Sequence, residues 1–196
     1  AVLVAFSSYH DNLNADTIIS YLASLVEWTP FFWSQDRYGM LIPLLTSGIS
    51  EPLHNVIVQN TLHITTSMLS FYFLAHYLFP GRWLEVGTFS IIAFIGLSGA
   101  RDIKDFLTPW QIYTPAILFG LIGLWLSKRS FVLAFCLLVL AHWCNFSVFI
   151  LLSLLIFVKS LEQVGRLGWS TVWLRRKDQV ALLVLSSLAG YLIRLP

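Results

Sequence analysis

Residues 7–51 read SSYHDNLNADTIISYLASLVEWTPFFWSQDRYGMLIPLLTSGISE and interrupt a chain that is otherwise strongly apolar. This stretch carries half of the ten acidic residues of the protein: Asp11, Asp16, Glu27, Asp36 and Glu51. It is also rich in aromatic residues. A long, acid-bearing and aromatic segment ahead of the main apolar runs is the first place to look for a functional site.

The composition predicts a membrane protein. Of 196 residues, 57% are hydrophobic, 15% are aromatic and only 11% are charged, whereas soluble domains carry about 25% charged residues. The net charge of +2 gives no reason to expect a nucleic-acid partner. Cys136 and Cys144 lie in or beside an apolar run, where a free cysteine behaves as a small buried hydrophobe, so neither a disulfide nor a metal site is expected from them.

The predicted fold is all-α: a polytopic transmembrane helical bundle with an amphipathic surface helix in its first external loop. Residues 1–6 are the end of a first span, because a spanning helix needs about 20 residues, and the chain is therefore expected to be a fragment of a longer protein. Residues 7–51 form the external loop, and residues 52–196 form about six further spans. The whole of 1–196 is expected to be a single transmembrane domain.

Within the loop, residues 15–27 have apolar positions at helical spacing and can be capped by Asn14 or Asp16. The predicted helix is too short to span and is expected at the membrane surface. Residues 28–45, WTPFFWSQDRYGMLIPLL, follow it. Aromatic residues at this density are typical of the headgroup region, or they stack on a ligand.

The later apolar runs predict a second span at 52–79 with a polar first half, a turn at 79–83, a span at 84–99, a polar loop at 101–109 and a span at 113–126. Polar side chains within a span usually face a bundle interior or a water-filled cavity. Two short runs, 131–141 and 146–158, flank HWCN (residues 142–145), which is either a turn or the middle of one long helix. A basic loop at 159–179 and a last span at 180–193 complete the prediction.

The basic residues favour a turn at HWCN. With that turn, eight of the twelve Lys and Arg fall on one side of the membrane: Arg82, Lys128, Arg129, Lys159, Arg166, Arg175, Arg176 and Lys177. The positive-inside rule places this side in the cytoplasm. The first loop, the 101–109 loop and HWCN then share the external face, so an external site must be built from them.

Asp16 is the best single candidate for chemistry, because a carboxylate at the mouth of a span could accept a proton or bind a divalent cation. It could equally be a helix cap. Asp36 and Arg37 could form a local ion pair, or Arg37 could bind a phosphate through its planar fork. Asp102 and Asp105 could ligate a hard cation or be merely solvated. The expected substrate-contacting set is Arg37, Asp36, Trp33 and His54.

Two segments carry a resemblance to a known family: NADTIISYLASLVEW (14–28) and DRYGMLIPLLTSGISEPLHNVIVQN (36–60). Their order, an external loop with an early Asp, a surface helix, an aromatic segment and a span with a polar beginning, resembles the start of the GT-C superfamily of polytopic glycosyltransferases, such as the protein mannosyltransferases and the aminoarabinose transferases of lipid A. The likeness covers most of the chain as topology but only about 40 residues as motif. Ala15-Asp16 stands where many members have an adjacent Asp-Glu pair.

The resemblance implies transfer of a sugar from a polyprenyl-phosphate donor to an acceptor on the external or lumenal face. It makes Asp16 the catalytic or metal-binding Asp of the first loop, places Asp102 and Asp105 in a second acidic motif, and gives Arg37 the donor phosphate, with Mg or Mn as a cofactor. The expected location is a bacterial inner membrane with a periplasmic site, or alternatively the endoplasmic reticulum. The oligomeric state is not predicted.

Two other hypotheses remain open at this point. In the first, the protein is a non-catalytic membrane subunit whose aromatic loop docks a partner. In the second, it transports a lipid or solute along a path through the polar second span. The transport hypothesis predicts a continuous channel lined by Asn55, Gln59, His63 and Thr66.

Overall fold

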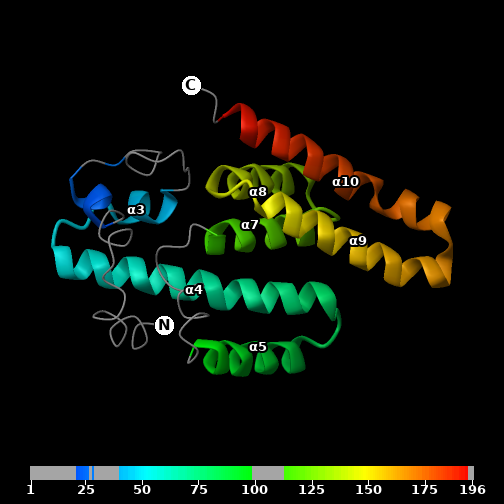
Figure 1. Cartoon of the computed structure of the whole chain (residues 1–196), viewed down its shortest axis with the longest axis horizontal. Helices are drawn as coiled ribbons and strands as arrows, with labels where there is room; N and C mark the ends of the chain where they lie inside the picture. The colour runs from blue at the N-terminus through cyan, green and yellow to red at the C-terminus, as the bar shows by residue number, and fades with distance from the viewer. Residues whose placement is uncertain (1–20, 27, 29–39, 99–112, 194–196) are drawn as a thin grey trace. The chain divides into compact units, whose positions relative to one another are not determined.

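A computed structural model describes residues 21–26, 28, 40–98 and 113–193 of the chain (Figure 1). All regular secondary structure in these residues is helical, so the all-α prediction is confirmed for this part of the protein. The chain divides into two compact units, residues 1–115 and 116–196, and each is described by itself below.

The first unit is organised around the long helix α4 (Pro52–Leu78), which lies between α3 (Leu41–Thr46) and α5 (Trp83–Ser98) along the chain. Glu51 is the N-cap of α4 and accepts a hydrogen bond from the backbone N–H of His54, while Pro52 occupies the first turn, where its missing N–H costs nothing. After a turn that begins at Phe79, α5 runs back along α4 (Figure 1). Residues 21–25 are also helical and belong to the predicted surface helix.

The second unit contains most of α7 (Tyr113–Leu126), together with α8 (Phe131–Cys144), α9 (Val148–Leu167) and α10 (Trp169–Leu192). Ser130 caps α8 by accepting from the backbone N–H of Leu133. Asn145 ends α8, and its Oδ1 accepts from the backbone N–H of Ser147. Helix α10 packs against both α8 and α9. The predicted turn at HWCN is thus confirmed, with the break at Asn145 because α8 continues through His142 to Cys144.

The predicted basic loop at 159–179 is wrong. Residues 159–167 continue α9, and 169–179 belong to α10. Lys159 pairs with Glu162 one turn later, with Nζ 2.6 Å from Oε2, and Arg166 lies in the last turn, where a cation interacts favourably with the helix dipole. Helix α9 ends at Gly168, whose φ of 75° lies in the left-handed region that favours glycine.

Three glycines allow the helices of the second unit to approach one another closely. A Cβ placed on Gly120 would lie 2.9 Å from Leu152 Cδ1, and one on Gly123 would lie 2.8 Å from Leu138 Cγ. A Cβ on Gly190 would lie 2.7 Å from His142 Cβ. We call Gly120, Gly123 and Gly190 the glycine seam. It joins α7 to α9 and α8, and α10 to α8.

Among the helices that the structure describes, α9 is long and apolar enough to cross a membrane, and α7 and α8 are apolar but have 14 residues each. Much of the apolar surface of the second unit faces outward: Phe131, Val132, Leu133, Ile150, Leu154, Phe157, Val158, Leu161, Val184, Leu185 and Leu188 are exposed. His142, Gln179, Ser186 and Ser187 are buried. An exposed apolar surface of this kind marks a contact with lipid or with another protein, which makes α9 a candidate membrane span.

Candidate functional site

Most of the predicted site residues lie outside the described part of the chain. Asp16, Trp33, Asp36 and Arg37 of the first loop are among them, and so are Asp102 and Asp105 of the 101–109 loop. Their predicted roles therefore stay predictions. The described site residue is His54.

His54 lies in the first turn of α4, beside the N-cap. Its Nδ1 is 3.2 Å from Oε2 of Glu51, and both side chains are largely exposed to solvent. The backbone N–H of His54 also donates to this carboxylate, and this hydrogen bond lowers the pKa of Glu51 below its ordinary value. His54 thus stands at the open end of α4, where an external ligand could reach it.

The structure brings together a set of residues that was not predicted as a catalytic or substrate site, although Asn55 and Gln59 belong to the channel lining of the transport hypothesis. The side chains of Tyr21 and Ser24 join the N-terminal half of α4 in a buried hydrogen-bond network. We call this network the polar clamp, and it consists of Tyr21, Ser24, Asn55, Gln59 and Asn60. All five are buried.

Asn55 is the centre of the polar clamp. Its Nδ2 donates to the backbone carbonyls of Thr46 at 2.9 Å and Ile49 at 3.1 Å, which ties α4 to the end of α3. Its Oδ1 accepts from Ser24 Oγ at 2.9 Å and from Gln59 Nε2 at 2.8 Å. The Asn55 side chain is fully enclosed by protein. Its hydrogen bonds are therefore shielded from water, and leaving any of these buried polar groups unpaired would be costly.

Further bonds fasten the same segment to α4 and to the residues before α3. The Tyr21 hydroxyl donates to Asn60 Oδ1 at 2.8 Å, and Gln59 Nε2 donates to Ser24 Oγ at 2.9 Å. The Trp28 indole N–H donates to the carbonyl of Met40 at 2.8 Å, and Ala23, Trp28 and Met40 pack together. The described parts of the first loop are therefore fixed on α4 at several points.

Some buried polar atoms on α4 have no hydrogen-bond partner among the described residues. Gln59 Oε1 and His63 Nδ1 are two of these, and they lie four residues apart and so on the same face of the helix. Further along α4, the Thr66 and Thr114 hydroxyls lie 3.2 Å apart, and Ser70 Oγ donates to the Thr114 carbonyl. A row of polar side chains thus follows one face of α4, as its polar sequence indicated.

The chemistry of the polar clamp is that of neutral amides and hydroxyls. It contains no carboxylate, and within the described part of the chain no group of three or more His, Cys, Asp and Glu could hold a metal ion. Asn55 and Gln59 are bonded to Ser24 rather than turned toward an open path. The clamp is suited to holding the first loop in place, and the loop residues themselves would have to supply any acid, base or charge.

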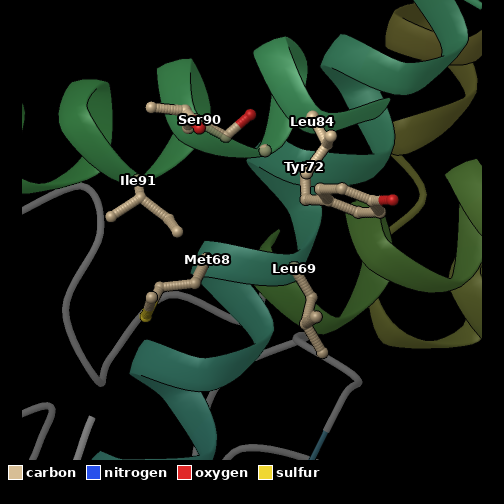
Figure 2. Close-up of a pocket in the computed structure, with 8 residues that line it drawn as sticks. Met68, Leu69, Tyr72, Leu84, Ser90 and Ile91 are labelled. Carbon is tan, nitrogen blue, oxygen red and sulfur yellow. The ribbon is translucent and has the colours of Figure 1, made fainter. Parts of the chain in front are cut away.

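The first unit also has an apolar groove of about 450 Å³, which lies between α4 and α5. In Figure 2, Met68 and Leu69 project from α4 and Ile91, Ser90 and Leu84 come from α5, with Tyr72 beside Leu84. None of the residues that line it is charged. Such walls suit an alkyl chain but provide little to orient a polar substrate.

Sequence reasoning did find the helix that carries the clamp, since the amides and hydroxyls of residues 52–70 stood out in an apolar run. It did not find Tyr21 and Ser24, because both lie in a short helix with mainly apolar neighbours and neither residue type is unusual there.

No protein-family model, no curated protein and no solved structure matches this chain.

Proposed function

We propose that this chain is part of a polytopic membrane glycosyltransferase of the GT-C kind, which moves a sugar from a polyprenyl-phosphate donor to an acceptor on the external face. The observation that carries the proposal is the polar clamp. It fastens Tyr21 and Ser24, which follow Asp16 by five and eight residues, to the N-terminal half of α4. A loop that carries catalytic groups must be held in place by a rigid scaffold, and a buried network of neutral hydrogen bonds provides this.

In this proposal Asp16 accepts the proton of the acceptor nucleophile, as a positioned carboxylate can. Arg37 binds the donor phosphate through paired N–H donors, with Trp33, Asp36 and His54 as further substrate contacts. A Mg or Mn ion, if required, would be held by Asp16, Asp102 and Asp105, because oxygen ligands suit these hard cations. His54 fits this arrangement, since its exposed side chain stands where α4 begins.

The proposed membrane placement puts the first loop on the external side and the basic helix ends of the second unit in the cytoplasm. Its support is the charge distribution. Lys128 and Arg129 lie in the turn between α7 and α8, while Arg166 lies in the last turn of α9 and Lys177 lies within α10. Gln179 Nε2 donates to Ser127 Oγ at 2.9 Å and thereby links α10 to the α7–α8 turn. The proposed compartment is a bacterial inner membrane, with the site in the periplasm.

The test is Asp16→Asn in the full-length protein, with sugar transfer from a polyprenyl-phosphate donor as the readout. General-base catalysis typically contributes about 10²–10⁴-fold, so turnover is expected to fall by at least about 100-fold. Asp11→Asn is the matched control, because it makes the same change in the same loop, and it should retain activity. Undiminished turnover in folded Asp16→Asn protein would refute the proposal.

A further inference from the structure

A second groove, of about 290 Å³, lies between α9 and α10 in the second unit. Its walls are mainly apolar and aromatic, including Phe149, Ile156, Phe157, Trp169 and Trp173. One wall belongs to α9, the candidate membrane span. The groove therefore has the dimensions and surface expected of a site for a hydrocarbon chain.

One charged residue, Arg176, also lines this groove, and its side chain is unusually enclosed. Arg176 is only 7% exposed, and one of its terminal nitrogens donates to Gln179 Oε1 at 2.7 Å. Among the described residues the ion pairs within 4.0 Å are Glu51–His54, Arg82–Glu85 and Lys159–Glu162. The Glu162 carboxylate of α9 interacts with the charge of Arg176 only over a longer distance. A guanidinium has five N–H donors, and a buried charge that makes no close ion pair is costly.

Gln179 fixes the position of this guanidinium. The Gln179 amide donates to Ser127 Oγ at 2.9 Å while its Oε1 accepts from Arg176. Arg176 is thus held against the α7–α8 turn with donors left over for an acceptor from outside the chain. Phosphate oxygens are the acceptors that an arginine fork matches best.

The surroundings of the groove favour an anionic ligand at a membrane surface. Arg175 and Lys177 are exposed beside Arg176, and Arg166 lies in the last turn of the facing helix. With Arg176, these basic residues outnumber the nearby acids Glu162 and Asp178. Trp169 and Trp173 lie one turn apart on α10 and are 62% and 59% exposed. Exposed tryptophans at the end of an apolar surface are typical of the headgroup level of a bilayer, and clustered basic residues attract anionic lipids.

We infer that the α9–α10 groove binds one anionic phospholipid, with an acyl chain along the apolar walls and the phosphate on Arg176. Each half of this ligand has a counterpart on the protein: the apolar walls match the chain, and the buried guanidinium matches the phosphate. The basic residues around Arg176 disfavour a choline headgroup. The inference rests on the second unit alone and does not depend on the proposed transferase activity.

The test uses native mass spectrometry of the full-length protein after exposure to an equimolar mixture of phosphatidylglycerol and phosphatidylcholine. One phosphatidylglycerol should be retained in preference to phosphatidylcholine. Arg176→Gln should reduce that retention by about tenfold, which corresponds to about 1.4 kcal/mol, because it removes the charge-assisted hydrogen bonds to the phosphate. Lys177→Gln makes the same charge change on an exposed neighbour and should retain most of the binding. Equal losses of phosphatidylglycerol retention in the two variants would show that only the total charge matters, and would overturn the inference.

A second pair of variants keeps the test independent of the folding of Arg176→Gln. Ser153→Phe fills the groove without touching its charge and should abolish lipid retention, whereas Leu154→Phe, on the exposed face of α9, should not. Inorganic phosphate at the same concentration as the lipid should not compete, because the acyl chain supplies part of the binding. Lipid retention unchanged in Ser153→Phe, or displacement by inorganic phosphate, would contradict the proposed site.

Discussion

The two units hold their helices together by different means. In the first unit, the polar clamp joins the 21–28 segment to α4 through hydrogen bonds between neutral side chains. In the second unit, the glycine seam lets helices approach until a single added carbon would clash. Hydrogen bonds fix direction and register, and glycine contacts maximise close packing. The first unit is thus held by directional bonds between side chains, and the second by the close approach of its helices.

Both solutions suit a lipid environment. Apolar side chains gain little by leaving lipid for one another, so helices in membranes associate through small residues and interhelical hydrogen bonds. If this comparison is right, substitutions in the clamp and in the seam should cost stability for different reasons. The free energy of unfolding in detergent micelles measures this loss of stability.

Asn55→Ala should have the largest effect. It removes the acceptor of two side-chain bonds and leaves the carbonyls of Thr46 and Ile49 without their donor. An unpaired buried polar group costs about 1–3 kcal/mol, and we expect a total loss of about 3 kcal/mol. Thr61→Ala is the control, because the Thr61 hydroxyl donates only within its own helix. Similar losses for the two variants would show that Asn55 is not the centre of a network.

Gly190→Ala should destabilise the protein by about 2 kcal/mol, within the usual range for an overpacked contact. The added carbon would lie 2.7 Å from His142 Cβ, an atom too close to the backbone to move aside, so α10 must shift from α8. Gly165→Ala in α9 is the matched control, since its added carbon meets nothing within 4 Å. Alanine is the better helix former by about 1 kcal/mol, so the control should be stabilised. A gain in stability for both variants would show that the close approach of α10 to α8 at Gly190 does not require glycine.

His63→Met should change stability by no more than about 1 kcal/mol, and in the stabilising direction. Its Nδ1 is buried without a partner, and replacing an unsatisfied polar group by an apolar one of similar size can be neutral or favourable. Asn60→Leu is the contrast, because it removes the acceptor of the Tyr21 hydroxyl and should be destabilising. A large loss for His63→Met would show that His63 bonds to a group beyond the described residues.

Glu51→Gln should have the smallest effect, visible as a pH dependence of the melting temperature. The hydrogen bond from the His54 N–H lowers the pKa of Glu51 in the folded protein. The unfolded chain therefore binds a proton first as the pH falls, and the stabilisation is present above the ordinary pKa of 4.5 and lost below it. Wild type and Glu51→Gln should differ slightly near neutral pH and converge in acid. A difference that grows in acid would contradict the capping role of this carboxylate.

The sequence predicted the helices well where apolar runs and turn residues agreed. The helix at 113–126 and the start of α4 at Pro52 agree with the predicted bounds, although at 14 residues α7 is a short apolar helix. The predicted loop at 159–179 is wrong, because charged residues also occur within helices. Lys159 and Arg166 instead occupy helical positions where an i,i+3 pair and the helix dipole stabilise them.

The site was harder to predict because it depends on partners distant in sequence. The polar residues of α4 could be seen to need an interior, but nothing local showed that Ser24 would meet Asn55 or that Tyr21 would meet Asn60. Arg176 shows the same limit, since its position in a basic run gave no sign that it would be buried in a groove. Burial and long-range pairing are properties of the folded chain.

The proposed topology is tested most directly by measuring on which side of the membrane the first loop and the basic part of α10 lie. Ser34→Cys and Lys177→Cys would be introduced separately into the full-length protein with Cys136 and Cys144 replaced, and each treated in intact cells with a maleimide that cannot cross the inner membrane. The account predicts that Ser34→Cys is labelled and that Lys177→Cys is labelled only after the membrane is permeabilised. Labelling of Lys177→Cys but not Ser34→Cys in intact cells would place the first loop in the cytoplasm and remove the external site.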